Sequence, residues 1–176
     1  DPELQLDVVK AIKKPELVVM DTMNFWIEHK KEQLLKAIDR ADILVLNDAE
    51  ARQLFNTPNL VKAANKALKL HTKAVIIKKG EHGALLFTDD KHFSAPGYPL
   101  ENIKDPTGCG DSFGGALTGY LAKTRDISEK NIRKAVVYGS VIASFNAEDF
   151  SIERLKKINH DDIEKRFREF RAIREF

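Results

Sequence analysis

Short apolar runs alternate with segments of helical periodicity through the first half of the chain. Three runs rich in aliphatic and β-branched residues predict strands buried on both faces, at 17–21, 42–47 and 74–80. The segment 25–41 places most of its apolar side chains on one face and predicts a single helix, and the segments 48–55 and 59–70 predict two more. The repeating unit is a strand followed by a helix, which predicts a mainly parallel sheet flanked by helices.

The pattern changes after Gly80. The segments 83–90 and 91–96 alternate around the turn-prone pair Asp89–Asp90, which predicts an antiparallel hairpin at the edge of the sheet. No strand is predicted beyond the hairpin, so the last third of the chain is expected to be helical. The helices expected there are 111–123, 128–146, a short piece from 151 and a charged helix from about 161.

The composition is that of a globular protein rather than of a nucleic-acid or membrane protein. At 176 residues and 43% hydrophobic, the chain can bury a core, and one α/β domain over 1–176 is the simplest organisation. Lysine plus arginine count 29 against 27 acidic residues, so no nucleic-acid partner is expected. The apolar runs are too short to span a membrane. A single cysteine forms no internal disulfide, which fits a cytoplasmic location.

The stretch KDPTGCGDSFGG, at 104–115, contains four of the nine glycines of the chain. A glycine-rich turn that enters a helix presents backbone N–H groups without intrahelical partners, and the helix dipole adds partial positive charge there. Gly108, Cys109 and Gly110 can bring their amides close to a phosphate, since two of the three have no side chain. This stretch, called the glycine loop below, is therefore a candidate anion site.

Asp111 follows these amides directly and has two interpretations. A carboxylate beside an anion site can accept the proton of a substrate hydroxyl that attacks a γ-phosphoryl group. Alternatively, Asp111 is an N-cap and the glycines form a tight turn. Two other phosphate loops are excluded by their context. The P-loop string is absent, and a Rossmann fingerprint needs a further strand where only helices are predicted.

The string DPTGCGDSF resembles the signature of the ribokinase-like carbohydrate kinases, the PfkB family. The resemblance implies a ribokinase-like fold and transfer of the γ-phosphoryl group of ATP to a hydroxyl of a sugar or sugar-like molecule. Asp111 would be the catalytic base, and Gly108, Cys109 and Gly110 would form the anion hole. ATP and Mg²⁺ are the cofactors that it implies, with a monovalent cation near Asp105.

Further segments follow in the order of that family. The string NDAE resembles its Asn-x-x-Glu motif, which implies that Asn47 and Glu50 organise Mg²⁺ and the phosphates. The string KKGEHGALL resembles its strand and turn beside the nucleotide, with Lys79, Gly80 and Gly83 as nucleotide-binding residues and Lys78 in place of the family's threonine. DTMNFW occupies the place of the Asp-x-Asn segment. YGSVIASFN resembles the helix that lines the adenine pocket, which includes Gly139 and Ala143.

Lysines near these motifs are candidates for phosphate contacts. Lys78, Lys79 and Lys104 could each approach a phosphate as a point charge, although solvated surface is the more common role of such lysines.

The resemblance covers only the later part of the family. It implies that the N-terminal strands and the small β-sheet lid are missing, and that the full-length protein could form a homodimer through that lid. The absence of an initiator Met agrees with an excised fragment, and this fragment is expected to be inactive alone. Two alternatives stay open: a non-catalytic nucleotide-binding module and a purely structural or interaction protein.

Overall fold

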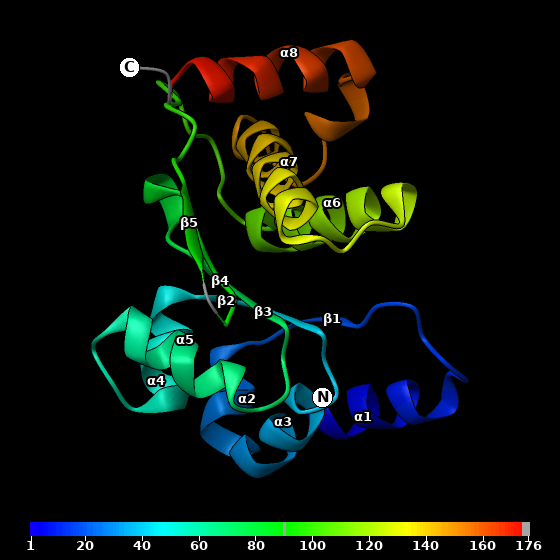
Figure 1. Cartoon of the computed structure of the whole chain (residues 1–176). Helices are drawn as coiled ribbons and strands as arrows, with labels where there is room; N and C mark the ends of the chain where they lie inside the picture. Colours follow the sequence, from blue (N-terminus) through cyan, green and yellow to red (C-terminus); the bar gives the residue numbers. More distant parts are fainter. Residues whose placement is uncertain (90, 174–176) are drawn as a thin grey trace. The chain divides into compact units, whose positions relative to one another are not determined.

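The computed structural model describes residues 1–89 and 91–173 and divides into two compact units (Figure 1). The first unit comprises residues 1–79 and 85–93, and the second comprises residues 80–84 and 94–176. The organisation as a single domain stays a prediction.

The secondary structure follows the predicted order. The first part of the chain forms α1 (Pro2–Ala11), β1 (Val19–Asp21), α2 (Asn24–His29), α3 (Lys31–Ile38), β2 (Ile43–Asn47), α4 (Asp48–Phe55), α5 (Leu60–Leu68) and β3 (Ala74–Lys78). The remainder forms η1 (Gly80–His82), β4 (Ala84–Phe87), β5 (His92–Ala95), α6 (Cys109–Thr124), α7 (Glu129–Ala147), η2 (Leu155–Lys157) and α8 (His160–Ala172). The α/β class and the helical last third are therefore confirmed.

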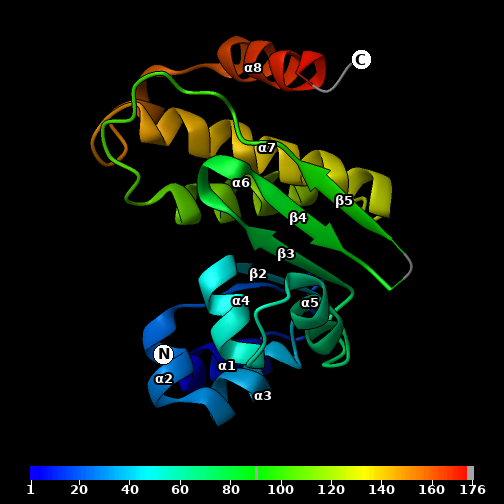
Figure 2. The ribbon, with the colours of Figure 1, turned by 90° about the vertical axis from the view of Figure 1, so that its left-hand side faces the viewer.

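The five strands form one sheet in the order β1-β2-β3-β4-β5. The first three strands are parallel, with Asp21 opposite Val45 and Asn47 opposite Lys78. β4 and β5 are consecutive neighbours whose arrows run in opposite directions in Figure 2, and the amide of Thr88 donates to the carbonyl of Lys91 at 2.8 Å. The mainly parallel sheet with an edge hairpin is thus as predicted. Asp90 of the predicted turn lies outside the described residues.

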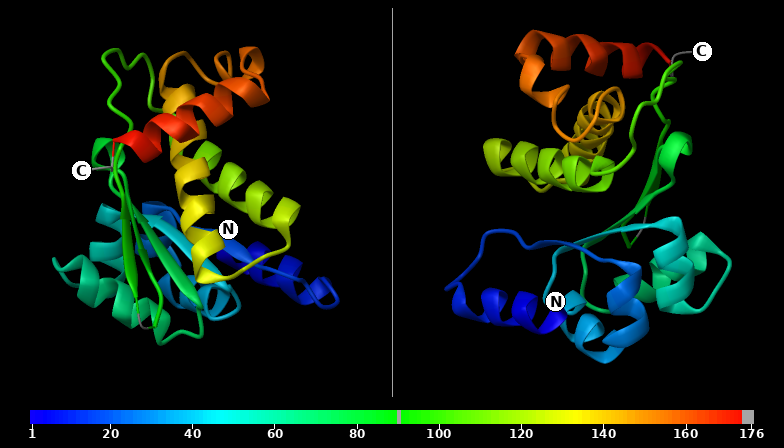
Figure 3. Two further views of the ribbon diagram at one scale, coloured as in Figure 1. Left: turned by 45° about the horizontal axis from the view of Figure 1, so that its top comes forward. Right: turned by 180° about the vertical axis from the view of Figure 1, so that it is seen from behind.

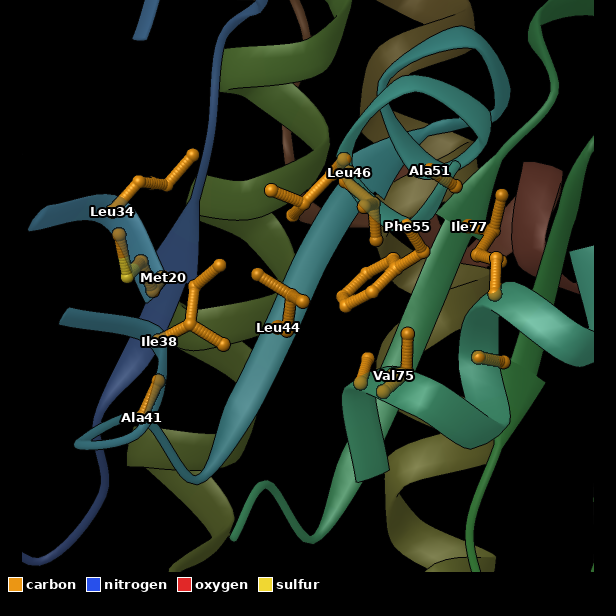
Figure 4. Close-up of a cluster of buried hydrophobic side chains, with 14 of the residues drawn as sticks. Met20, Leu34, Ile38, Ala41, Leu44, Leu46, Ala51, Phe55, Val75 and Ile77 are labelled. Carbon is orange, nitrogen blue, oxygen red and sulfur yellow. The ribbon is translucent and has the colours of Figure 1, made fainter. Parts of the chain in front are cut away.

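The core of the first unit lies between one face of β1–β3 and the helices α3, α4 and α5. Figure 4 shows aliphatic side chains of the three strands beside those of α3 and α4. The labelled residues are Met20, Leu34, Ile38, Ala41, Leu44, Leu46, Ala51, Phe55, Val75 and Ile77. Ile43, Val45 and Ile76 on the opposite face of the strands are at most 1% exposed. Burial of both faces explains why these strands are continuous apolar runs.

The single helix predicted over 25–41 is wrong, because the chain breaks at Lys30 into α2 and α3. Lys30 leaves the helical region with φ −140° and ψ 42°. Its ammonium group binds the carboxylates of Asp1 at 2.7 Å and Glu3 at 2.8 Å. Both partners lie at the start of α1, distant in sequence, so the local apolar periodicity carries no sign of the break.

The second unit is built on helices α6, α7 and α8. Figure 3 shows α7 beside α6, with α8 crossing α7, and residues of α7 and α8 form a common apolar cluster. Phe170 of α8 is 1% exposed and packs with Val141 and Phe145 of α7. α8 thus attaches to α7 through its apolar face. Within the described residues, no helix is both long enough and apolar enough to span a bilayer.

Candidate active site

Polar residues end each of the three parallel strands of the first unit. Asp21 is the last residue of β1, Asn47 the last of β2 and Lys78 the last of β3. Because the carboxyl ends of parallel strands lie along the same side of the sheet, these three side chains start from that side, called the strand edge below. This edge is where ligands of open α/β sheets bind.

Asn47 and Glu50 form a reciprocal capping box at the start of α4. The side chain of Asn47 accepts the amide of Glu50 at 2.8 Å, and the carboxylate of Glu50 accepts the amide of Asn47 at 2.8 Å. One oxygen of each side chain is engaged in this way. The capping role fixes both groups at the strand edge, and it leaves Oε1 of Glu50 without a hydrogen-bond partner in residues 1–89 and 91–173.

Lys78 is an ion-pair partner rather than a surface lysine. Its side chain is 17% exposed, and its ammonium group lies 2.7 Å from the carboxylate of Asp21. The expectation of solvated surface is therefore wrong for Lys78. The sequence shows Asp21 as the aspartate of DTMNFW at the end of a predicted strand. Its pairing with Lys78 depends on the strand order β1-β2-β3, which the sequence does not show.

Glu50 is 5% exposed, so its carboxylate is the most strongly desolvated one at this edge. Burial raises the pKa of Glu50, the bond from the Asn47 amide lowers it, and the negative charge of Asp21 raises it. The positive charge of Lys78 lowers the same pKa. A cation bound beside Glu50 would offset the free-energy cost of keeping this buried carboxylate charged.

The donor set at this edge suits Mg²⁺ better than a metal held by protein ligands alone. No group of three or more His, Cys, Asp or Glu side chains gathers in the described part of the chain. Mg²⁺ keeps several waters and is usually bound through one or two carboxylates together with substrate phosphates. The buried carboxylate of Glu50 meets that requirement.

Glu50→Gln separates the capping role from the cation role. Because burial raises the pKa of Glu50, the folded state binds this proton more tightly than the unfolded state, and stability falls as pH rises from the ordinary value of 4.5 through the raised one. Glutamine keeps an acceptor for Asn47 without the buried charge. We expect the melting temperature at pH 7 to be equal or up to about 4 °C higher, with a flatter dependence on pH.

In a thermal scan, the same variant should lose any stabilisation that Mg²⁺ gives to the wild type. Glu32→Gln is the matched control, because Glu32 is an exposed glutamate in the first turn of α3. A clear fall in the melting temperature of Glu50→Gln without ligand would contradict this account of the buried charge.

The glycine loop of the second unit enters α6 at Cys109, two residues before the predicted start. Gly108 is the N-cap, with φ 81° in the left-handed region that glycine adopts without strain. The amide of Cys109 donates to the carbonyl of Pro106 at 3.1 Å. Within the described residues, the amides of Gly108, Gly110 and Asp111 have no acceptor. Three unpaired N–H groups thus stand at the positive end of a 16-residue helix.

Asp111 lies in the first turn of α6 and is exposed. No side chain or amide of residues 1–89 and 91–173 hydrogen-bonds its carboxylate. Gly108 rather than Asp111 is the N-cap, and no side-chain cap bond is made there. The capping interpretation of Asp111 is therefore not supported, and the carboxylate is free to accept a proton.

Cys109 lacks the environment of a nucleophile. Burial raises the pKa of its thiol, Asn146 lowers it and the charge of Asp105 raises it. The thiol lies 3.5 Å from the carbonyl of Ala143 on α7. Cys109 is thus a small packing residue in the loop.

Gly83 is required by packing as well as by backbone conformation. Its φ is 84°, and a Cβ there would lie 2.1 Å from the carbonyl oxygen of Ala95. Gly97, which sequence reasoning missed, lies on the facing segment, where a Cβ would come within 1.9 Å of the carbonyl oxygen of Glu81. Gly80 has φ 55° and open space around the Cβ position. The two backbone segments pass at contact distance because both carry glycine.

The other predicted nucleotide residues lie on α7 and at the end of β3. Gly139 is buried, and a Cβ there would lie 2.9 Å from the ring of Phe113 on α6, so this glycine allows α6 and α7 to approach. Ala143 is half-buried one turn further along α7. Lys79 is half-buried after β3 and forms no ion pair within the described residues.

The predicted residues fall into two groups. Asn47, Glu50 and Lys79 belong to the first unit, whereas the glycine loop with Asp111, and Gly80, Gly83, Gly139 and Ala143, belong to the second. Asp105, beside the expected monovalent cation, accepts the amide of Thr107 at 2.9 Å, and this bond lowers its pKa.

Known proteins are similar to this chain in sequence. A family model described as pfkB family carbohydrate kinase matches residues 4–154. The nucleoside kinase of Methanocaldococcus jannaschii is 29% identical over 169 residues, which are 89% of this chain and 53% of the relative. The cytidine kinase of Thermococcus kodakarensis is 34% identical over 124 residues, which are 68% of this chain and 44% of the relative. The chain thus spans about half the length of these two relatives.

The fold is similar to that of solved ribokinase-family structures. The crystal structure of the Methanocaldococcus jannaschii nucleoside kinase, an archaeal member of the ribokinase family, matches with a TM-score of 0.77 at 25% identity. The match covers 96% of this chain and 54% of that one. The ribokinase-like fold expected from the motifs is confirmed. Because the family model extends over most of the sequence, this chain belongs to the pfkB family of carbohydrate kinases.

Proposed function

We propose that this chain is the nucleotide-binding and catalytic-base portion of an ATP-dependent kinase that phosphorylates a hydroxyl group of a sugar-like molecule. One observation carries the proposal: three unpaired amides and the exposed carboxylate of Asp111 lie together at the N-terminal end of α6. Membership of the pfkB family and similarity to two nucleoside-type kinases support it.

The glycine loop and Asp111 divide the chemistry between them. The amides of Gly108, Gly110 and Asp111 stabilise the negative charge of the transferring phosphoryl group. The carboxylate of Asp111 accepts the hydroxyl proton as the acceptor oxygen forms its bond to the γ-phosphorus. The bond between that phosphorus and the bridging oxygen of ADP breaks, and ADP leaves with the electron pair. Cys109 contributes its small side chain to the loop, since its amide is already bonded.

The residues of the first unit hold the metal ion in this proposal. Glu50, with Asn47, would hold Mg²⁺ through its carboxylate and waters, and the ion would neutralise phosphate charge. Lys79 would contact the phosphates of the nucleotide through its positive charge. Gly80 and Gly83 would border the nucleotide together with Gly139 and Ala143. Asp105 would lie beside a monovalent cation.

The acceptor belongs to the class of sugars and nucleosides. Both relatives described above are named for nucleoside-type substrates, so a ribose hydroxyl of a nucleoside is the first acceptor to test. Asp111 as the base and the glycine loop are compatible with any alcohol whose hydroxyl group reaches Asp111.

Stabilisation by ATP and Mg²⁺ tests the proposal directly. A ligand at about ten times its Kd stabilises the folded state by about 1.4 kcal/mol. For a chain of this size we expect the melting temperature to rise by about 3–5 °C. Mg²⁺ without ATP should give a clearly smaller rise. No rise with ATP and Mg²⁺ would contradict the proposal and favour a structural role. A rise without turnover in the complete protein would favour a non-catalytic nucleotide-binding module.

A further inference from the structure

A buried asparagine of α7 contacts three residues of the glycine loop. Asn146 is 1% exposed and ends the string YGSVIASFN, in which only Gly139 and Ala143 were given a role. Its Nδ2 donates to the carbonyl of Thr107 at 2.9 Å and lies 3.6 Å from the thiol of Cys109. Its Oδ1 accepts the hydroxyl of Ser112 at 3.1 Å. The side chain of Asn146 thus contacts Thr107, Cys109 and Ser112, which lie before, between and after the residues with unpaired amides.

Asn146 also lies directly behind the left-handed glycine. A Cβ at Gly108 would be 3.7 Å from Nδ2 of Asn146, which is ordinary van der Waals contact. The bond to Thr107 fixes the peptide that precedes Gly108, and the bond to Ser112 fixes the first turn of α6. The orientation of the Gly108 and Gly110 amides is therefore set from both sides by a single amide group.

The entry to the loop is attached to the same end of α7. The carbonyl of Ala147 accepts the amides of Lys104 at 2.9 Å and Asp105 at 3.4 Å. The ammonium group of Lys104 lies 2.6 Å from Asp149, and this bond, with the amide of Phe150, lowers the pKa of Asp149 to about 2. These contacts hold the first residues of the loop, whereas Asn146 reaches its centre through a buried side chain.

We propose that Asn146 is a positioning residue that orients the phosphoryl-binding amides of the glycine loop. The proposal rests on the proposed function of that loop. Asparagine suits the position because it presents a donor and an acceptor at once, and each meets its partner inside the protein. An apolar side chain of equal size leaves the carbonyl of Thr107 and the hydroxyl of Ser112 without these partners, so the loop would re-orient toward other hydrogen bonds. Displacement of catalytic groups by about 1 Å can lower a rate by about 10²-fold.

The test compares Asn146→Leu with Asn131→Leu. Asn131 is the matched control because it is a second buried asparagine of α7, and its Nδ2 bonds the hydroxyl of Thr124 and the carbonyl of Asp126. Both substitutions remove a buried amide from the same helix. Amide hydrogen exchange without nucleotide is measured at Cys109 and Ser112, whose N–H groups bond Pro106 and Gly108. Asn146→Leu should accelerate exchange there by about tenfold or more relative to Asn131→Leu.

Catalysis in the complete kinase supplies the second readout. We expect kcat of Asn146→Leu to fall by about 10- to 100-fold with little change in KM for the acceptor, and kcat of Asn131→Leu to stay near that of the wild type. Equal rates of amide hydrogen exchange at Cys109 and Ser112, together with equal kcat, in the two variants would overturn the proposal. If Asn146→Leu fails to fold, Asn146→Ser is measured in the same way, with the same two outcomes.

These readouts separate the inference from the function on which it rests. The exchange measurement uses no nucleotide, so it reports loop orientation even if the loop binds no phosphate. Absence of ATP stabilisation in the wild type would refute the proposed function. Faster exchange in Asn146→Leu alone would still establish that Asn146 holds the loop.

Discussion

Replacing Asp111 by asparagine in the complete kinase should lower kcat by about 10²–10⁴-fold, the usual contribution of a general base. Asparagine keeps the size of the side chain but cannot accept the hydroxyl proton. The amides of Gly108 and Gly110 stay in place, because the carboxylate of Asp111 makes no bond to residues 1–89 and 91–173 that would hold the loop. The affinity for ATP should therefore change by less than about threefold, since a base acts in the transition state. Steady-state kinetics and a nucleotide titration measure the two effects.

Asp161→Asn is the matched control for this experiment. Asp161 is also an exposed aspartate in the first turn of a helix of the second unit. Its substitution should leave kcat close to that of the wild type. Near-normal turnover of Asp111→Asn would refute its assignment as the base, and a parallel loss in both variants would point to a general effect on folding.

The largest expected loss of stability follows Gly83→Ala. The new Cβ would lie 2.1 Å from the carbonyl oxygen of Ala95 and 2.4 Å from the carbonyl carbon of Pro96, and both are backbone atoms that cannot move aside singly. The φ of 84° adds strain for any residue with a Cβ. We expect the free energy of unfolding to fall by about 3 kcal/mol or more, in the range that overpacking and backbone strain together produce. Urea denaturation measures it.

Gly80→Ala separates strain from steric overlap. Gly80 also has a positive φ, of 55°, but nothing lies within 4 Å of its Cβ position. Its substitution should cost about 1–2 kcal/mol, which is the strain alone. Equal losses of unfolding free energy in the two variants would show that the segments at 81–83 and 95–97 do not pass at contact distance.

Much of the fold could be predicted because its signals are local. The apolar runs at 43–47 and 74–78 are buried on both faces, and a run of that length between helical segments has few other structures. The glycine loop was identifiable because four glycines gather at 104–115, directly before and within the start of a predicted helix. Asn47 and Glu50 were identifiable because the string NDAE, at the end of a predicted strand, resembles the Asn-x-x-Glu motif of the family.

The features that were missed depend on partners far apart in the sequence. Lys30, where the helix breaks, pairs with Asp1 and Glu3 at the start of α1. Lys78 pairs with Asp21, 57 residues earlier. The need for glycine at position 97 depends on the close approach of its segment to that of Gly83. Asn146 is 39 residues from the carbonyl that it bonds. Neither periodicity nor a short motif records such contacts.

A titration followed by ¹H–¹⁵N correlation spectra tests the central claim most directly, namely that the unpaired amides at the start of α6 bind a phosphoryl group. ATP with Mg²⁺ is added to the labelled chain, and the backbone amides of the glycine loop are observed one by one. The account predicts saturable shifts that are largest at Gly108, Gly110 and Asp111 and smaller at Cys109, whose amide is bonded to Pro106. Unchanged signals at these three amides, while shifts appear elsewhere in the chain, would contradict it.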